Sequence, residues 1–265
     1  MKFKSNNFNQ TQLIKLKDDI WLKNQRVAGK IVANTLNLLR NYIDNKTTLS
    51  LIELNNIAEK FITEAGGTPT FKGYKGFPAG VCCSIDNERV HQLVHGIPTN
   101  YKLQDGDLIS FDLGVTYEGA IGDAAITCIY GKPKSEQHVK LIKVTEECLM
   151  KGIEAVKVGK RLGCIGNAIY KHATSQGFSV ITKYGGHFLC YNRPHAEPFV
   201  SNKDNQNNGI RLQPGLTLAI EPMLTTGSTN TTVSKDGWTV LCDEAESSHF
   251  EHTIYTHKDY VEIIT

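Results

Sequence analysis

Two aspartates interrupt a segment that otherwise has the pattern of a buried β-hairpin. The stretch LISFDLGVTYEGAIGDAA, residues 108–125, alternates apolar and polar side chains up to a central turn, as a strand with one apolar face does. If the chain reverses between Tyr117 and Glu118, Asp112 and Asp123 lie directly opposite each other, with Cβ atoms roughly 5 Å apart. Like charges at that distance repel, so either one carboxyl group keeps its proton or a cation lies between them. A solvated hairpin face with a chance pair of acids is the alternative.

Two further acids and an imidazole extend this set. Glu221 follows the apolar run LTLAI, and Glu251 interrupts an apolar strand in SSHFEHTIYT. Four buried acids would carry four negative charges, which two divalent cations would cancel. One imidazole from KYGGHFLCYNRPHAEPF, which contains His187 and His195, would complete a mainly oxygen-donor set. Such a set suits Mn²⁺, Fe²⁺ or Co²⁺, with Zn²⁺ as a further candidate, and bridging carboxylates hold two ions about 3.5–4 Å apart.

Helices are predicted on both sides of this hairpin in the sequence. Asp18 or Asp19 can cap a helix that runs to about residue 42, with an apolar stripe made of Ile20, Val27, Ile31, Leu36 and Leu39. The capping box Ser50-x-x-Glu53 begins a second helix that ends at Gly66-Gly67. A strand near residues 81–85 and the hairpin follow.

The second half of the chain repeats this order and part of its sequence. Two helices are predicted over about 135–156 and 162–175, and strands then continue to the C-terminus. The segment LQDGDLISFD, residues 103–112, aligns without gaps with LQPGLTLAIE, residues 212–221, and both end in an acid. This match indicates an internal duplication. A pseudo-twofold axis would then bring Asp112 and Glu221 face to face.

Length and composition exclude several classes of protein. The 265 residues suffice for one large α/β or α+β domain, or two small ones, and a net charge of +2 does not indicate a nucleic-acid substrate. Seven cysteines without C-x-x-C spacing fit reduced, mostly buried thiols. No apolar leader and no run of about 18 apolar residues is present, which predicts a cytoplasmic protein without a membrane segment. A solvated helix face, rather than a docking patch, is favoured for Lys2, Lys4, Lys15, Lys17, Lys23 and Lys30.

Five motifs occur in a fixed order along the chain. They are VHGIP at 94–98, LQDGDLISFDLG with GD at 122–123, LQPGLTLAIEPM, DGWTV at 236–240 and FEHTI at 250–254. This set, with ten residues between Asp112 and Asp123, resembles the type I methionine aminopeptidases of the pita-bread fold, over residues 18–265. The resemblance implies an α+β fold with pseudo-twofold helix-helix-strand halves, about 18–131 and 132–265, around a curved antiparallel sheet. One catalytic domain over residues 1–265, without a separate N-terminal extension domain, is expected.

The resemblance also implies a role for each candidate site residue. The ligand positions of a dinuclear metal site fall on Asp112, Asp123, His187, Glu221 and Glu251. Glu221 is also the implied general base, while His95 and His195 flank the scissile bond, one at the leaving side and the other at the oxyanion. The implied reaction removes the N-terminal methionine of nascent proteins and peptides when the next residue is small. The substrate's free α-amino group would bind a metal ion, which restricts cleavage to N-terminal residues.

A methionine pocket and the biological setting follow from the same resemblance. Besides His95 and His195, the substrate-binding positions fall on Phe71, Tyr74, Phe77, Cys82 and Trp238. Each of these could equally be ordinary core by its own chemistry, and the motif context favours the pocket for Tyr74 and Trp238. N-terminal peptides of nascent proteins are the implied partners, together with transient association with the ribosome. A cytoplasmic monomer is expected.

Two segments depart from the family pattern. The family has G-H-G-[IV]-G at the ligand histidine and six residues before the next histidine, whereas this chain has GHFLC and seven residues between His187 and His195. A bulge or loop must absorb the extra residue. The link before VHGIP is also longer by several residues, and His91 within it is expected to be an exposed loop histidine. Both changes border the substrate cleft.

Two other functions remain open on the sequence alone. Proline dipeptidases with Xaa-Pro specificity and creatine-hydrolysing enzymes share the fold, but they usually carry an extra N-terminal domain for which this chain has no room. A catalytically inactive pita-bread module that binds proteins is the other alternative. Loss of ligand acids would mark that class, and all four acids are present here.

Overall fold

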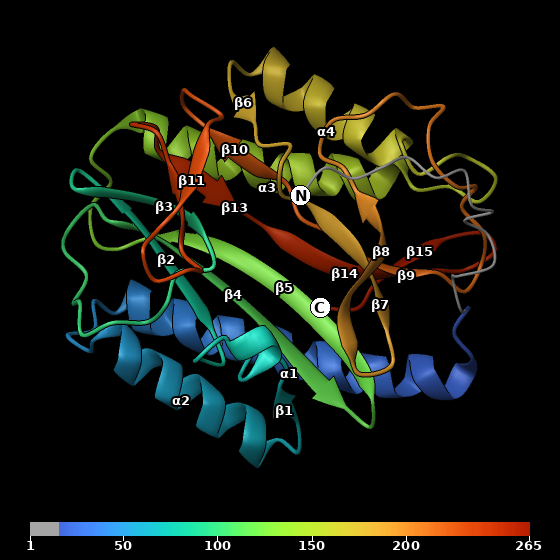
Figure 1. Ribbon diagram of the computed structural model, residues 1–265, viewed down its shortest axis with the longest axis horizontal. Coiled ribbons are helices and arrows are strands. Elements are labelled where there is room, and N and C mark those ends of the chain that lie inside the picture. The colour runs from blue at the N-terminus through green and yellow to red at the C-terminus, as the bar shows by residue number, and fades with distance from the viewer. Residues whose placement is uncertain (1–15) are drawn as a thin grey trace.

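Two pairs of α-helices occur in the computed structural model, which describes residues 16–265 (Figure 1). The first pair is α1 (Asp19–Asp44) with α2 (Leu51–Glu64), and the second is α3 (Glu136–Ala155) with α4 (Cys164–Ser175). A short 3-10 helix, Tyr74–Gly76, lies between α2 and the sheet strands that follow. The helix positions agree with those predicted from the sequence to within a few residues.

Side chains placed just before the helices explain where three of them begin. Asp18 accepts a hydrogen bond from the backbone N–H of Trp21 (2.8 Å), and Ser50 and Glu53 form the predicted capping box. Ser135 accepts from the N–H group of His138 (3.2 Å) at the start of α3. Each cap satisfies a backbone donor that no helical carbonyl can reach, so these starts are determined locally.

Two expectations about the N-terminal region are wrong. Ile20 does not belong to the apolar stripe of α1, because it lies in the first turn on the outer face and is 70% exposed, whereas the adjacent Trp21 is buried. Lys17 is also buried rather than solvated, with its Nζ 3.4 Å from Sγ of Cys190. The exposed positions expected for Lys23 and Lys30 are confirmed, while Lys2, Lys4 and Lys15 lie outside the described residues.

A large, curved antiparallel sheet forms the middle of the molecule. Its strands follow the order β11-β12-β3-β2-β4-β5-β14-β9-β7-β8, with β1 beside β4 and β15 beside β14. Their bounds are β1 Thr68–Pro69, β2 Cys82–Asn87, β3 Val90–Val94, β4 Leu108–Tyr117, β5 Ala120–Ile129, β7 Gly186–Cys190, β8 Arg193–Val200, β9 Thr217–Ile220, β11 Thr231–Val233, β12 Val240–Cys242, β14 Glu251–Thr256 and β15 Val261–Ile263. A small second sheet joins β13 (Ser247–His249), β10 (Met223–Thr225) and β6 (Ser179–Val180).

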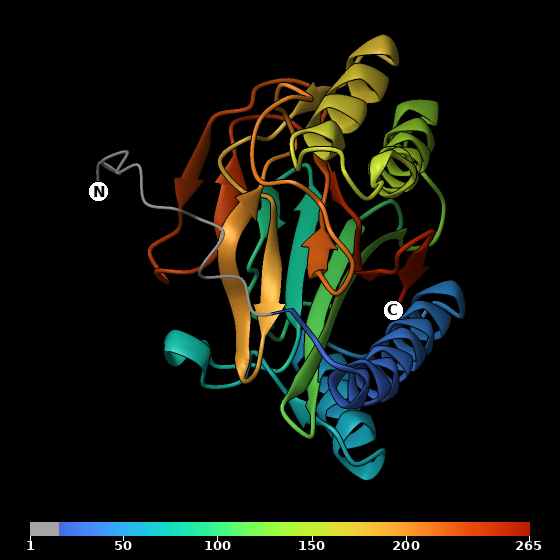
Figure 2. The same ribbon diagram turned by 90° about the vertical axis from the view of Figure 1, so that its right-hand side faces the viewer.

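Both helix pairs cover the same side of the large sheet, as the view in Figure 2 shows. One apolar core lies between α1, α2 and the first-half strands and includes Leu39, Leu54 and Phe111. A second core lies between α3, α4 and the second-half strands and includes Ile169 and Leu218. This arrangement confirms the predicted duplication of helix pairs around one antiparallel sheet. The opposite face of the sheet stays free for polar side chains.

The register of the β4–β5 hairpin differs from the predicted one by two residues. Asp112 pairs with Ala125, and Asp123 pairs with Gly114, so the two acids are diagonal neighbours instead of directly opposite. The reason is the turn: the chain reverses at Glu118 and Gly119, whose φ angles of 47° and 77° are both positive. Two-residue hairpin turns of this kind match the twist of the strands. A shift of two residues keeps both acids on the same face.

His91 is not the exposed loop histidine expected from the sequence. The longer link forms β3, which pairs with β2, and Nδ1 of His91 lies 2.7 Å from Oδ1 of the buried Asp86. Oδ2 of Asp86 accepts a hydrogen bond from the backbone N–H of Ser247 (2.6 Å). Burial raises the pKa of Asp86 to about 6, although its hydrogen bond with His91 opposes that shift. The lengthened segment is therefore ordered and attached to β13.

The cysteines agree with the expectation from composition. All seven cysteines are free thiols, and six are buried. In residues 16–265 no helix combines the length and the hydropathy needed to cross a membrane.

Helix α1 packs closely on the sheet and the C-terminal segment at Gly29. A Cβ atom added at Gly29 would lie 2.1 Å from the carbonyl oxygen of Ile264, and one added at Gly122 of β5 would lie 2.8 Å from the nitrogen of Gly29. No side chain fits between these backbones. Glycine at position 29 thus permits the contact between α1, β5 and the C-terminal segment.

We expect Gly29→Ala to destabilise the protein by about 1–3 kcal/mol, which corresponds to a fall in Tm of several degrees. Alanine is the better helix former by about 1 kcal/mol, so a loss would report the clash with Ile264. Thermal unfolding followed by circular dichroism measures the effect. Lys30→Ala, at the exposed neighbouring position, is the control, and equal Tm values for the two variants would contradict the close approach.

Candidate metal centre and active site

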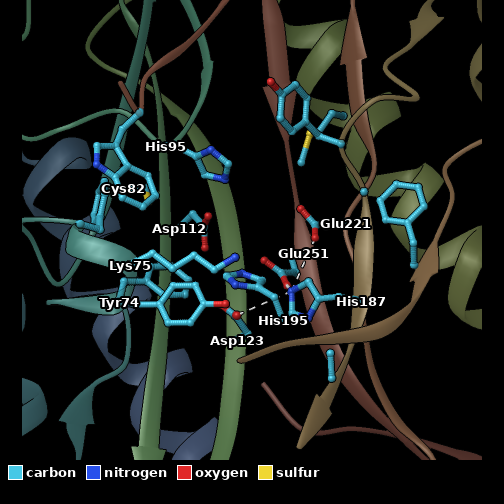
Figure 3. Close-up of a pocket in the computed structure, with 18 of the residues that line it drawn as sticks. Tyr74, Lys75, Cys82, His95, Asp112, Asp123, His187, His195, Glu221 and Glu251 are labelled. Atoms are coloured by element: carbon cyan, nitrogen blue, oxygen red, sulfur yellow. Dashed lines mark ion pairs between the residues drawn. The ribbon is translucent and has the colours of Figure 1, made fainter. Parts of the chain in front are cut away.

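The predicted ligands lie on five neighbouring strands near the middle of the large sheet. The strand order β4-β5-β14-β9-β7 brings together, in the same order, Asp112, Asp123, Glu251, Glu221 and His187, of which Glu221 directly follows β9. Ala125 pairs with Asp112 on one side and with Glu251 on the other, which places these acids on one face. That face is opposite to the one covered by the helices. Figure 3 shows Asp112 and Glu221 approaching the site from opposite walls.

His187 is the centre of the cluster. Its Nε2 lies 3.6 Å from Oε1 of Glu221, 3.8 Å from Oε1 of Glu251 and 3.9 Å from Oδ2 of Asp123. Its Nδ1 lies 3.2 Å from the carbonyl oxygen of Phe188, which can only accept a hydrogen bond, so the ring proton belongs on Nδ1. Nε2 is then a lone pair that faces three carboxylate oxygens. This arrangement of acceptors fits a cation.

Four carboxylate oxygens of the cluster have no hydrogen-bond partner among the described residues. Oδ1 of Asp112, both carboxylate oxygens of Asp123 and Oε1 of Glu251 are buried without a hydrogen bond. Three overlapping groups each bring their donor atoms within 4.8 Å of one another, namely Asp112-Asp123-Glu251, His187-Glu221-Glu251 and Asp123-His187-His195. A buried carboxylate needs a hydrogen-bond donor or a cation beside it. The residues present therefore fit divalent metal ions.

Burial raises the pKa of all four acids in the cluster, and repulsion from neighbouring acids adds to the shift at Asp112, Asp123 and Glu251. The pKa of Asp112 rises to about 7, chiefly through burial, with His249 opposing and Glu221 adding to the shift. Burial also raises the pKa of Glu221 to about 7. The pKa values of Asp123 and Glu251 rise further, because each is buried and faces the other acids. Without cations, the folded state holds these carboxyl groups partly protonated.

His95 reaches the cavity because of two unusual backbone positions. His95 has a φ of 58°, and the following Gly96 lies so close to β2 that a Cβ there would be 2.2 Å from the carbonyl oxygen of Cys83. The N–H group of Gly96 donates to Oγ of Ser84 (3.0 Å). The turn after β3 thus points the imidazole inward. Burial lowers the pKa of His95 to about 4, so its ring is neutral.

His195 is brought into the site by the predicted irregularity between β7 and β8. The pairing changes from Gly186 with Val200 to Phe188 with Ala196, and it shifts again before the turn. These bulges absorb the extra residue between the histidines, and the rings of His187 and His195 meet edge to face with centroids 4.5 Å apart. His195 also lies 5.1 Å from the ring of Tyr74. Burial, and then the neighbouring His187, lower the pKa of His195.

A cavity of about 330 Å³ lies over this cluster. The predicted metal ligands line it, and so do all the predicted substrate-binding residues. The latter are Phe71, Tyr74, Phe77, Cys82, His95, His195 and Trp238. Phe71, Phe77 and Cys82 also form one apolar cluster with Trp238, whose ring lies 5.3 Å from that of Phe77. Apolar walls and acidic donors thus share one cavity (Figure 3).

The comparisons with known proteins agree with this geometry. The model of metallopeptidase family M24 matches residues 23–258. The chain belongs to this metallopeptidase family. A methionine aminopeptidase of Clostridium perfringens is 41% identical over 254 residues, which cover 96% of this chain and 99% of that protein. A methionine aminopeptidase structure from Thermotoga maritima has a TM-score of 0.90 at 34% identity and covers 96% of this chain and 99% of its own.

A more distant structure shows that a peptidase with a different name shares this fold. A prolidase from Pyrococcus furiosus has a TM-score of 0.71 at 17% identity, and the match covers 94% of this chain and 65% of that one. It shares the fold of this M24 metallopeptidase, and the predicted pita-bread α+β architecture is confirmed. The predicted resemblance to methionine aminopeptidases is confirmed as well.

Sequence reasoning missed several residues in and around the metallopeptidase site, among them Lys75 and His249. Lys75 lines the cavity, with its Nζ 5.3 Å from the centre of the Tyr74 ring. His249 is buried, and its Nε2 lies 3.5 Å from Oε2 of Glu221. The signal for His249 was its spacing, because a residue two positions before Glu251 on an extended segment lies on the same face.

Asp112→Asn should raise the Tm of the metal-free protein by an amount that depends on pH. The unfolded chain releases this proton near pH 4, whereas the folded state holds it up to a pKa of about 7. Between pH 4 and pH 7 the folded state binds more protons than the unfolded state, so the free energy of unfolding falls as pH rises. Asparagine does not ionise, and the substitution therefore removes that loss. The gain should grow from pH 4 to pH 7, level off above it and reach up to about 4 kcal/mol, from about 1.4 kcal/mol per unit of pKa.

Thermal unfolding in a chelator at several pH values tests this expectation. Asp259→Asn, at an exposed position, is the matched control for the loss of one carboxylate. A difference between Asp112→Asn and the parent that stayed constant from pH 4 to pH 8 would contradict the buried, repelled carboxyl group.

Proposed function

We propose that the protein removes the N-terminal methionine of peptides and proteins by metal-dependent hydrolysis when the second residue is small. The observation that carries the proposal is the shared cavity, in which an acidic donor cluster and an apolar aromatic pocket lie side by side. A peptide whose first side chain fills the apolar pocket has its amino group and first amide bond beside the donors. At about 330 Å³ the cavity lies at the small end of ligand sites, roughly 300–1,000 Å³.

The donor set is proposed to hold two divalent ions. Asp112, Asp123, His187, Glu221 and Glu251 would be the ligands, and Co²⁺, Mn²⁺, Fe²⁺ or Zn²⁺ would suit this mixture of carboxylates and one imidazole. Bound ions of this kind polarise a carbonyl group and lower the pKa of water. His187 is fixed in the ligating tautomer by the carbonyl oxygen of Phe188.

The chain's own side chains account for orientation and proton movement. Glu221 takes the proton of the attacking water, because its carboxylate lies at the wall of the cavity beside the donor cluster. His95 and His195 are neutral, so each carries one N–H that can donate a hydrogen bond. One would donate at the amide on the leaving side and the other at the oxyanion that forms from the carbonyl oxygen.

The proposal extends to partners and place of action. N-terminal peptides of nascent chains are the natural substrates of such an activity. Transient association with the ribosome and action as a cytoplasmic monomer follow from the resemblance described above. The apolar pocket of Phe71, Phe77, Cys82 and Trp238 supports methionine as the recognised side chain.

The protein should hydrolyse Met-Gly and Met-Ala peptides when supplied with a divalent metal, and it should leave formyl-methionine peptides intact. Formylation converts the amino group to an amide, which neither carries a positive charge nor binds a metal ion well, and it leaves the side chain unchanged. Release of free methionine across a series of Co²⁺, Mn²⁺, Fe²⁺ and Zn²⁺ is the measurement. Faster cleavage of Ala-Pro peptides would favour Xaa-Pro specificity, and no hydrolysis with any metal would favour an inactive binding module.

His195→Ala should lose about 10²–10³ in kcat while keeping its metal content, which is the usual cost of one oxyanion donor. Steady-state kinetics together with metal analysis measures both properties. Arg193→Ala, on the same hairpin and exposed, is the control and should keep the parental rate. Parental turnover by His195→Ala would remove this imidazole from the mechanism.

Glu221→Gln should lose metal affinity and turnover together.

A further inference from the structure

His249 is held in place by its backbone and has no access to the cavity. Its N–H donates to Oγ1 of Thr127 (2.9 Å), the same hydroxyl donates to its carbonyl oxygen (2.8 Å), and the residue pairs with Met223 of β10. Only 1% of its surface is exposed, and it is not among the residues that line the cavity. The imidazole therefore approaches the donor cluster from behind and cannot contact a substrate.

Neither ring nitrogen of His249 has a hydrogen-bond partner among residues 16–265. The facing carboxylate is that of Glu221, whose Oε2 lies 3.5 Å from Nε2 of His249, while its Oε1 lies 3.6 Å from Nε2 of His187. Glu221 thus lies between two imidazoles, one on each oxygen. A movement of about 0.6 Å would bring His249 to the ordinary N–H···O distance of about 2.9 Å.

Other roles for this side chain fit the surroundings less well. An ordinary core histidine satisfies its buried N–H group, and this one has none of the usual partners. A direct metal ligand would share a donor group with the acids, but none of the three groups of clustered donors includes His249. His249 also lies near enough to Asp112 to affect its pKa, but among the described residues the carboxylate within 4 Å of a His249 ring nitrogen is that of Glu221, through the oxygen that His187 does not face.

We propose that His249 is a positioning residue that donates its Nε2–H to Oε2 of Glu221 and so orients the carboxylate toward His187 and the metal site. Partners of this kind in the second layer around a metal fix the orientation and raise the basicity of the ligand. The inference rests on the proposed function only in treating Glu221 as a metal ligand. It requires no methionine specificity.

Metal binding by two variants tests the hydrogen bond without an activity assay. His249→Leu removes the donor, and His249→Gln keeps an N–H group of similar reach. With Co²⁺ as the probe, calorimetry of the full-length protein should give a Kd about 10–100 times weaker for His249→Leu and within a few-fold of the parent for His249→Gln. The visible absorption of the Co²⁺-loaded protein should change in the first variant and be retained in the second.

His252→Leu is the matched control, because it removes an imidazole from the adjacent strand position where Nδ1 meets Oγ1 of Thr265 (3.0 Å) instead of an acid of the cluster. Thermal unfolding of the metal-free variants separates lost affinity from lost fold. Parental Co²⁺ affinity in His249→Leu would overturn the proposal. Equal losses of affinity and equal spectral changes in both His249 variants would overturn it too, since they would indicate a direct ligand.

A measurement on the unsubstituted protein avoids dependence on the folding of a variant. In the Zn²⁺-loaded, ¹⁵N-labelled protein, NMR should show a neutral His249 that carries its proton on Nε2. A proton on Nδ1, or the shifts of a metal-bound nitrogen, would overturn the proposal. Failure of the protein to cleave methionine peptides would leave each of these readouts in place, so the two proposals fail separately.

Discussion

The crowding of four acidic side chains on one face of a sheet is the constraint on which the rest of the structure depends. Asp112, Asp123, Glu221 and Glu251 are largely removed from water, and the pKa of each is raised. Like charges this close cost on the order of a few kcal/mol unless protons or cations lie between them. The other face of the same strands is packed under the two helix pairs. The apolar cores therefore offset the repulsion and keep the donors together for metal.

Neither half of the duplicated fold holds the site alone. The first half contributes two acids and the second contributes two acids and His187, and the halves meet where β5 pairs with β14. Oγ1 of Thr253 accepts the N–H of Asp123 (2.9 Å) and donates to its carbonyl oxygen (2.8 Å), which fixes the backbone of one acid to the strand of the other half. The proposed substrate pocket is divided in the same way, because Trp238 packs on Phe77. The proposed binding and chemistry thus both depend on contact between the two halves.

The surroundings of each imidazole distinguish its role. His187 donates a hydrogen bond from its Nδ1–H to the carbonyl oxygen of Phe188, so the lone pair on its Nε2 faces the acids. His95 and His195 line the cavity as neutral rings, whereas His249 lies behind it with Glu221 in front. Burial lowers the pKa of all four, so none of these imidazoles supplies a positive charge that would offset the acids. In the proposed mechanism the same residue type thus serves as metal ligand, as hydrogen-bond donor to the substrate and as hydrogen-bond donor to a ligand.

The sequence by itself determined the features that depend on near neighbours. The capping box Ser50-x-x-Glu53 and the alternation around Asp112 are local, and the ordered motifs identified the metallopeptidase family and its candidate ligands. Tertiary structure decided what depends on distant partners. The positive φ angles at Glu118 and Gly119 set the hairpin register. His91 is held by the buried Asp86, which in turn accepts a hydrogen bond from Ser247. His249 faces Glu221 only because Glu221, far away in sequence, lies just before β10, the strand that pairs with β13. The two-residue spacing between His249 and Glu251 does not encode that proximity.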